Sequence, residues 1–541
     1  MSAELTVDIN QFLGIKPSDN SITDDLFHFE QMENFYIENS TGELKVREGT
    51  YNQGNSANAA LGHKFMDIWT NDLTGDSWIV LITSGDKVEM QVNIQGNIFN
   101  TNIAAAALAG LVWGFQYNNL YYLLGSGGLY TVTTAAVTTS VNATYNLTYG
   151  CIFKERMFAI DGTTTNVIRY SDVGLPATIQ TTNFITVGKG DGERITGMQP
   201  ISGDRLLIFK ETSIWVLYIV GNTTATWELK LVSADFGSAY YTSVQYYDGM
   251  TYFIGMRGVY RTDGVSVQTI SGPVEHWFTS RGDIATGRAP ATGGPIPEYT
   301  KNDYAGIWNN QYIFTMQEVT NTLFIYNIEF NAWYTWTHSI GQRVGFFVGD
   351  TVRTGALASA TFPHFSGLKF TTLAGSTCYI LIYNNQKDAP FLLTASSWDI
   401  PVYYADAITG VASGGSSNGG GFAYTATLVT NSISFNEYIA WKRFRQAYVT
   451  IRGAASFVLS SSRSEDTYTA GGTVAITGST LETDITVLKF KLFRFEQFLK
   501  IKLIITPEAK TSAYIVKPIS VYAIKLLANV KGRIAKTSRA A

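Results

Sequence analysis

Apolar and polar positions along the chain form a strand–turn–strand unit that returns about every 40–60 residues, each time with a different sequence. In each unit a polar or glycine-containing turn comes directly before a short apolar run, and a second apolar run follows after a small gap. A period of this length, with several strands in each unit, is typical of β-propeller blades. The pattern therefore predicts an all-β protein with a propeller of about six blades over residues 61–400. The turns that open the six units begin at Asp76, Asn119, Glu155, Asp204, Gly249 and Asn310.

Two features interrupt the regular spacing of the units. Gly and Pro gather between Gly282 and Glu298, which predicts an insertion there. Another apolar run begins at Thr377 and fits either a further blade or the closure of the ring. No segment has the pattern of a helix longer than three turns.

The two ends of the chain differ from the repeated part. Residues 1–60 are polar and irregular, which predicts an extended arm with one hairpin. Residues 401–430 contain the Gly- and Ser-rich stretch Gly410–Gly421, which fits a linker or a loop at a blade rim. In residues 431–541 apolar and polar positions alternate again, so we expect a separate antiparallel, β-sandwich-like module with one packed face and one face in water.

The composition favours a protein that presents surfaces to other subunits. Aromatic residues make up 13% of the 541 residues and charged residues only 15%, whereas about a quarter of a typical soluble domain is charged. Much of the surface is therefore expected to be covered by other subunits. The first residues lack the pattern of a signal peptide, and no apolar run is long enough to span a membrane. We expect a soluble chain that matures in a cytoplasm, with Cys151 and Cys378 as buried thiols.

Charge is distributed unevenly. Residues 431–541 carry 17 Lys and Arg against 7 Asp and Glu, a net +10. The whole chain has 39 Lys and Arg and 43 Asp and Glu, so residues 1–430 carry 22 against 36, a net −14. The basic excess lies on residues 441–445, on residues 489–494 and on the tail from Lys531. Solvated sheet edges explain most of it, docking to an acidic neighbour is the sharper hypothesis, and direct nucleic-acid binding is the weakest.

The sequence contains few residues in patterns typical of catalysis. The five histidines are scattered without ligand spacing, so neither a zinc site nor a Ser-His-Asp triad is indicated. The best cluster of carboxylates is Asp191 and Glu193, in Gly190-Asp-Gly-Glu-Arg. Asp-Gly pairs recur at Asp161, Asp248 and Asp263, between strands, where tight turns require them. Turn chemistry thus explains these residues without catalysis, and we predict neither an enzyme nor a bound metal or cofactor.

One long stretch resembles a known family. It runs from Phe153-Lys-Glu-Arg-Met-Phe-Ala-Ile-Asp-Gly through Gly203-Asp-Arg-Leu-Leu-Ile-Phe-Lys to Gly258-Val-Tyr-Arg-Thr-Asp-Gly and Thr269-Ile-Ser-Gly-Pro. These sequence segments are similar to those of the β-propeller tail proteins of short-tailed bacteriophages. The family is that of the nozzle proteins, also called tail tubular protein B or packaged-DNA stabilisation protein. Similar phrases near Met32 and Tyr326 extend the resemblance over residues 25–340.

The resemblance implies a structural protein of the virion tail, made in the cytoplasm of a bacterial host. It implies a homohexameric ring that contacts the head–tail adaptor protein, carries tail fibre or needle proteins, and lets double-stranded DNA pass at ejection without sequence-specific binding. On this reading Asp191 and Glu193 are candidates for lining the channel. The candidates for partner docking are the cations of the basic tail, Lys531, Arg533, Lys536 and Arg539.

Two other functions remain open from the sequence. A tail-tip or baseplate propeller that binds host glycans would use exposed aromatic residues. A propeller glycosidase would need a pair of carboxylates, for which Asp191 and Glu193 are the candidates. A glycan array separates the first from a DNA conduit, and activity on polysaccharides tests the second.

Overall fold

The structure is a computed structural model. It describes residues 4–16, 26–38, 41–46, 50–52, 63–70, 77–83, 86–94, 97–98, 102–103, 107–108, 110–221, 224–238, 241–255, 257–275, 277–278, 305–308, 310–314, 322–337, 344–353, 376–384, 390–393, 405–406, 422–423, 425–434, 441–453, 455–462, 468–475, 485–496, 498–507 and 519–530. The chain forms two compact units. Residues 52–321 and 340–397 form the first, here called the propeller unit. Residues 1–51, 322–339 and 398–541 form the second, here called the sandwich unit.

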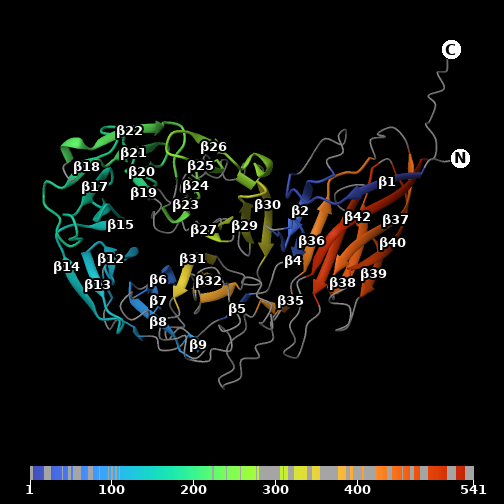
Figure 1. The fold of residues 1–541 in the computed structure, drawn as a ribbon, viewed down its shortest axis with the longest axis horizontal. Helices are drawn as coiled ribbons and strands as arrows, with labels where there is room; N and C mark the ends of the chain where they lie inside the picture. Colours follow the sequence, from blue (N-terminus) through green and yellow to red (C-terminus); the bar gives the residue numbers. More distant parts are fainter. Residues whose placement is uncertain are drawn as a thin grey trace, which may run out of the picture. The chain divides into compact units, whose positions relative to one another are not determined.

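The described strands of the propeller unit form seven successive antiparallel groups, which we call blades 1 to 7 (Figure 1). Their strands are β6 (His63–Thr70), β7 (Ser77–Thr83), β8 (Val88–Ile94), β9 (Asn97–Ile98) and β10 (Asn102–Ile103) in blade 1; β11 (Trp113–Tyr117), β12 (Leu120–Gly125), β13 (Gly128–Val132) and β14 (Thr138–Asn142) in blade 2; β15 (Leu147–Phe153), β16 (Arg156–Asp161), β17 (Val167–Tyr170) and β18 (Phe184–Thr186) in blade 3; β19 (Ile195–Ile201), β20 (Arg205–Lys210), β21 (Ile214–Tyr218) and β22 (Glu228–Ser233) in blade 4; β23 (Gln245–Tyr247), β24 (Met250–Ile254), β25 (Val259–Thr262) and β26 (Val267–Thr269) in blade 5; β27 (Ala305–Trp308) and β28 (Gln311–Phe314) in blade 6; and β31 (Val344–Arg353), β32 (Ser376–Asn384) and β33 (Pro390–Leu393) in blade 7.

The first strands of the blades stand around a common axis and close a ring. In chain order β6, β11, β15, β19, β23, β27 and β31 each lie beside the next, and β31 lies beside β6 (Figure 1). This closed succession of sheets defines a β-propeller, so the predicted fold class is confirmed. The ring has one blade more than the six turn positions suggested, because the apolar run at Thr377 forms β32 of a further blade.

Each turn identified from the sequence comes directly before the second strand of a blade. The second strands are buried along nearly their whole length: β16 and β20 have one half-buried residue followed by five buried ones, and β28 is buried at every residue. A strand in the middle of a blade is covered on both faces by the neighbouring blades, so it is apolar throughout and does not alternate. This burial explains why the second strands dominate the sequence pattern.

Tight turns join the first and second strands of several blades. Asn118 and Asn119 have φ of 46° and 60°, and Lys154 and Glu155 have φ of 49° and 58°. Two consecutive left-handed residues make the type I′ turn, whose twist matches that of the two strands it joins.

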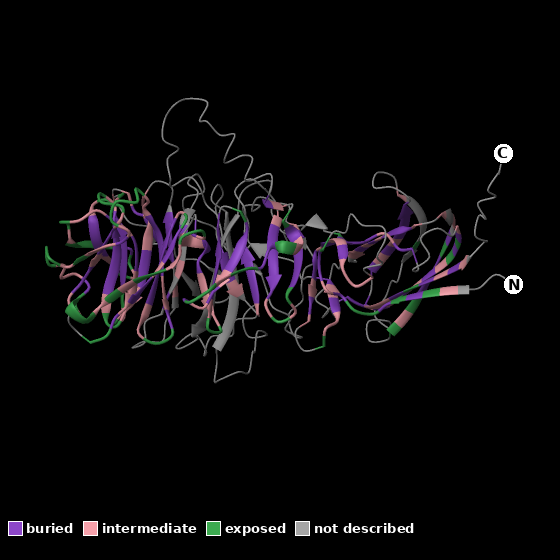
Figure 2. Cartoon of the chain, turned by 90° about the horizontal axis from the view of Figure 1, so that it is seen from above, coloured by how far each residue is buried: buried purple, intermediate pink, exposed green. Residues whose placement is uncertain are grey.

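Adjacent blades pack through continuous apolar layers. Between blades 3 and 4, Phe158, Ile168, Leu206, Ile208 and Leu217 are buried together. Similar clusters lie between blades 1 and 2, 2 and 3, and 4 and 5. Figure 2 shows buried residues concentrated in the strands and exposed residues mainly in the turns.

The sandwich unit contains two main sheets (Figure 1). Burial alternates along β37, where Phe444, Val449 and Ile451 are buried while Arg443 and Arg445 are exposed. The predicted β-sandwich-like module is thus confirmed. The first sheet holds β1 (Glu4–Ile9), β3 (Phe35–Ile37), β4 (Leu44–Val46), β37 (Lys442–Arg452), β40 (Ile485–Glu496) and β42 (Ser520–Val530); the second holds β2 (Phe29–Glu33), β29 (Thr322–Asn327), β30 (Ala332–Thr337), β36 (Ala426–Thr430), β38 (Ala455–Ser462), β39 (Thr469–Ala475) and β41 (Lys500–Pro507).

Several short elements accompany these sheets and blades. A two-stranded sheet in the sandwich unit pairs β34 (Ala405–Asp406) with β35 (Phe422–Ala423), and β5 (Thr50–Asn52) lies where the chain passes from one unit to the other. Three 3-10 turns belong to the propeller unit: η1 (Thr224–Thr226), η2 (Tyr241–Ser243) and η3 (Gly272–Val274). Among the described residues only Trp277 and Phe278 are α-helical, and no described helix is long and apolar enough to cross a membrane.

The two units do not follow the consecutive boundaries predicted from the sequence (1–60, 61–400, 401–430 and 431–541). Residues of the expected N-terminal arm are strands of the sandwich unit: β1 pairs with β42, with Glu4 opposite Asn529, and β2 pairs with β36. Residues 322–339 also belong to the sandwich unit. Hydrogen bonds between strands that are distant in the sequence set these boundaries. The local composition of the chain therefore does not reveal where the units begin and end.

Candidate functional site

Asp191 and Glu193, the candidates for lining a channel, lie in the connection between β18 of blade 3 and β19 of blade 4. The carboxylate of Asp191 forms an ion pair with Lys210, whose side chain is fully buried at the end of β20. Asp191 Oδ1 also accepts the backbone N–H of Glu193 at 3.0 Å. Glu193 accepts hydrogen bonds from the hydroxyls of Thr212 and Ser213, which form the turn between β20 and β21. Both carboxylates therefore tie the connection to blade 4.

The backbone of this connection is shaped to bring the ion pair together. Gly188 has φ of 61°, and a Cβ atom there would lie 2.0 Å from Asp191 Oδ2 and 2.6 Å from Lys210 Nζ. Lys210 Nζ also donates to the carbonyl of Val187 at 3.4 Å. A side chain at position 188 would therefore strain the backbone and displace the ends of Asp191 and Lys210, so this position favours glycine.

The surroundings of Asp191 favour its charged form. Burial raises the pKa of Asp191, but hydrogen bonds from Lys210 and from the backbone N–H of Glu193, together with the positive charge of Lys210, outweigh that effect. The pKa of Asp191 consequently lies below its ordinary value of 3.8. A carboxylate held in this way acts as a fixed structural anion.

The Asp-Gly pairs serve in turns. Asp161 Oδ1 accepts the backbone N–H groups of Thr163 and Thr164, and its other oxygen pairs with Arg169 at 2.9 Å. Asp263 Oδ1 accepts the N–H groups of residues 265 and 266. These geometries agree with the turn interpretation of the sequence. That Asp191 and Glu193 line a channel stays a prediction.

The other sequence-based candidates fall outside the described residues. The basic tail, with Lys531, Arg533, Lys536 and Arg539, begins after the last described residue, Val530. The insertion between Gly282 and Glu298 and the stretch Gly410–Gly421 are outside as well.

A cluster of aromatic rings at the axis of the propeller was not predicted. Trp113 of β11 contacts Phe65 of β6 (ring centroids 4.8 Å apart), Tyr149 of β15 (4.7 Å) and Tyr241 of η2 (5.3 Å). Tyr149 and Tyr241 also meet each other at 4.9 Å. In β19, a Cβ atom on Gly197 would lie 3.2 Å from the Cα of Tyr241.

This axial cluster joins segments that are not neighbours around the ring. Phe65, Trp113 and Tyr149 come from the first strands of blades 1, 2 and 3, and Tyr241 directly precedes blade 5. Contact between Trp113 and Tyr241 therefore crosses the axis, so aromatic side chains fill the centre of the propeller at this level. One signal was available in the sequence: Trp113 and Tyr149 each stand five residues before the first residue of a type I′ turn.

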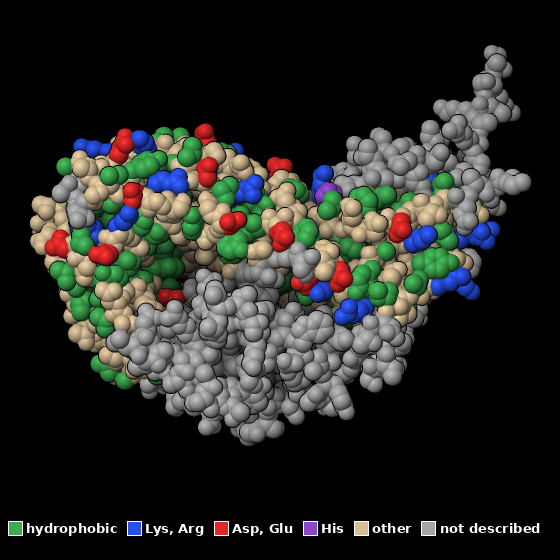
Figure 3. Space-filling model, viewed as in Figure 1, with side chains coloured by type: hydrophobic (Ala, Val, Ile, Leu, Met, Phe, Trp, Pro, Cys, Tyr) green, Lys and Arg blue, Asp and Glu red, His purple; other side chains and the backbone are tan. Residues whose placement is uncertain are grey.

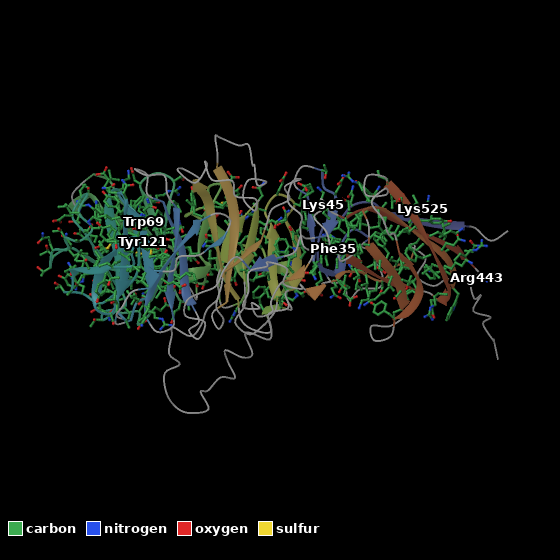
Figure 4. The ribbon with its side chains drawn as sticks, turned by 90° about the horizontal axis from the view of Figure 1, so that it is seen from below. Phe35, Lys45, Trp69, Tyr121, Arg443 and Lys525 are labelled. Atoms are coloured by element: carbon green, nitrogen blue, oxygen red, sulfur yellow. The ribbon has the colours of Figure 1, made fainter. Side chains whose placement is uncertain are left out.

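A buried polar contact links blades 1 and 2 beside this cluster. The hydroxyl of Tyr121 donates to Asp67 Oδ2 at 2.6 Å, and Trp69 lies 6.3 Å from the Tyr121 ring (Figure 4). Burial, and then the negative charge of Asp67, raises the pKa of Tyr121 well above 10. The phenol therefore stays protonated and fixes β12 to β6. Among the described residues, no three His, Cys, Asp or Glu side chains form a group that could hold a metal ion.

Comparison with known proteins gives likenesses of structure only. No protein-family profile and no curated protein matches the chain. The structure of BBS1N in complex with ARL6DN covers 65% of this chain and 99% of its own, at 10% identity and a TM-score of 0.40. The N-terminal domain of Nup159 covers 67% and 98% (10% identity, TM-score 0.38), and YCF48 from Cyanidioschyzon merolae covers 49% and 95% (12% identity, TM-score 0.30). Because every score is below 0.5, the fold assignment rests on the closed ring of sheets.

Proposed function

We propose that this protein is a structural component of the tail of a short-tailed phage, where several copies form the nozzle ring that closes and conducts the DNA channel. The observation that carries the proposal links sequence and fold. The sequence segments that resemble the nozzle family lie mainly between Phe153 and Gly272, and these residues form successive blades of a propeller. A propeller is the fold that the resemblance implies.

The axial cluster supports a role in which the propeller bounds a DNA passage from outside and does not itself contain the passage. With Phe65, Trp113, Tyr149 and Tyr241 packed across the axis, this level of the propeller has no room for a DNA duplex. A passage for DNA must therefore be bounded by several copies of the chain. The ring implied by the resemblance supplies such a passage.

The charge of the chain fits a conduit. Residues 1–430 carry a net −14, and an acidic wall repels phosphate, so it does not retain a passing duplex as a cationic wall would. Asp191 adds little to this field, because Lys210 neutralises its charge. The head–tail adaptor, fibre or needle proteins and DNA are the partners that this function requires.

Electron microscopy of the purified full-length protein, with mass photometry of the same sample, tests the proposal. We expect closed rings with a central opening between the subunits, and a mass near six times 59.5 kDa. A glycan array on the same sample serves as a control, and no binding is expected. Two results would overturn the nozzle assignment. One is a protein that is monomeric at all concentrations and forms no ring on virions, and the other is specific binding to host glycans.

A further inference from the structure

The first sheet of the sandwich unit presents an exposed cationic face. Three neighbouring strands bring five exposed cations to it: Arg443 and Arg445 from β37, Lys489 and Lys491 from β40, and Lys525 from β42. We call these five residues the cationic face. On the side of the molecule seen in Figure 3, Lys and Arg side chains gather near β37 and β40, and Figure 4 labels Arg443 and Lys525.

Strand register places these side chains in rows. Lys525, Tyr448 and Lys489 stand directly opposite one another on β42, β37 and β40, and Gln446 stands opposite Lys491 in the next row. Residues that face each other across antiparallel strands project from the same side of a sheet. The buried side chains Val449, Phe490 and Ile524 project from the other side. The cations thus share one solvent-facing surface.

The positive charge of this face is largely uncompensated. Within the described part of the chain, none of the five cations takes part in an ion pair, although Asp8 of β1 stands opposite Lys525. Lys489 instead places its ammonium 5.7 Å from the centre of the Tyr448 ring. By contrast, Lys154, Arg194 and Lys230 of the propeller unit are each paired with a carboxylate. Like charges on adjacent strands repel, so an anionic partner would reduce the repulsion among these cations.

Exposed apolar side chains adjoin the cations on the same strand. Ile485 and Val487 of β40 are 61% and 58% exposed, and they alternate in phase with Lys489 and Lys491. A phosphate backbone offers nothing apolar to cover them. A polypeptide that carries both carboxylates and apolar side chains can cover Ile485 and Val487 and neutralise the cationic face.

From this arrangement we propose that the cationic face, together with Ile485 and Val487, is a docking surface for an acidic polypeptide that also presents apolar side chains. The proposal does not depend on the nozzle function. A ring could assemble without this surface, and the surface could bind its partner in a protein that forms no ring.

A labelled peptide tests the inference. The probe is a fluorescein-labelled 12-residue peptide of alternating Glu and Val, and fluorescence anisotropy follows its binding to the full-length protein at low salt. Replacing Lys489, Lys491 and Lys525 with Gln removes three exposed contacts and should weaken binding about tenfold. The matched control replaces Lys154, Lys189 and Arg257, exposed cations of the propeller unit, with Gln. It changes the net charge equally and should bind like the parent protein.

Two further probes separate the kinds of partner. Ile485→Thr with Val487→Thr keeps β-branched residues and should weaken binding of the Glu-Val peptide but not of a 12-residue oligoglutamate. A 20-nucleotide single-stranded DNA is the third probe. Three results would overturn the proposal: an equal loss of peptide binding in the Lys489/Lys491/Lys525 variant and in the matched control, no effect of the Thr variant, or tighter binding of DNA than of the peptide. So would dissociation of an oligomer of this chain by the Lys→Gln variant, because the occupant would then be a second copy.

Discussion

The ion pair between Asp191 and Lys210 gives the sharpest test of the propeller geometry. Lys210 is fully buried, whereas the Asp191 side chain is 33% exposed. Removing one member of a fully buried pair costs about 3–5 kcal/mol, because the remaining charge has no partner. Water can reach Asp191, so Asp191→Asn should cost somewhat less, about 2–3 kcal/mol of unfolding free energy.

Lys210→Met is the matched variant. It removes the buried charge and keeps much of the side-chain volume, so we expect a change within about 1 kcal/mol. The double variant Asp191→Asn/Lys210→Met should be more stable than Asp191→Asn alone. Urea denaturation followed by tryptophan fluorescence measures these differences as shifts of the transition midpoint. Equal midpoints for Asp191→Asn and Lys210→Met would refute the reasoning. They would show that the buried charge of Lys210 is not stabilised by its ion pair with Asp191.

The pH dependence follows from the lowered pKa of Asp191. A group whose pKa is lower in the folded protein stabilises the fold at pH values above its unfolded pKa, and this stabilisation is lost as the pH falls through the folded value. The difference between the parent protein and Asp191→Asn should therefore be constant from pH 7 to about 5 and should shrink below the ordinary value of 3.8. A difference that grew toward acid would contradict the described pair.

Three further predictions concern the propeller unit. Trp113→Ala should lower the unfolding free energy by about 3 kcal/mol because it opens a void in the axial cluster, whereas Trp113→Phe keeps a ring there and should cost less than half as much; thermal unfolding compares the two. Gly188→Ala should cost about 2–3 kcal/mol in urea denaturation, since it combines a left-handed backbone with a clash against the ion pair, and a change below 0.5 kcal/mol would contradict this geometry. Burial raises the pKa of the Cys151 thiol to about 12, so in a Cys378→Ser background the native protein should react with a thiol reagent at pH 8 far more slowly than the urea-unfolded protein, and equal rates would show that the thiol is accessible.

The sequence predicts the propeller well because of one strand in each blade. The second strands, such as β16 and β20, are buried on both faces and follow polar turns, so each appears as an apolar run after a recognisable signal. First and fourth strands give weaker signals. Strand β18 is only Phe184–Thr186, and Phe184 is half exposed, so nothing local separates it from a loop.

Contacts between distant residues limit what the sequence alone can show. Asp191 and Glu193 stood out as a carboxylate cluster, but their partners Lys210, Thr212 and Ser213 lie in the next blade. The residue types gave no indication of this pairing. The cationic face was visible only as separate basic segments, and strand register was needed to place Lys525 beside Lys489 on one surface.

The pairing of β1 with β42 has a consequence for how the chain is made. A ribosome delivers Glu4 well before Asn529, the residue opposite it in the partner strand. Strands β1 and β2 must therefore wait with open edges while the whole propeller unit emerges, and such edges invite wrong pairing. The first sheet of the sandwich unit can be completed only after the propeller unit has emerged, and a nascent chain released before residue 520 has no β42 to pair with β1.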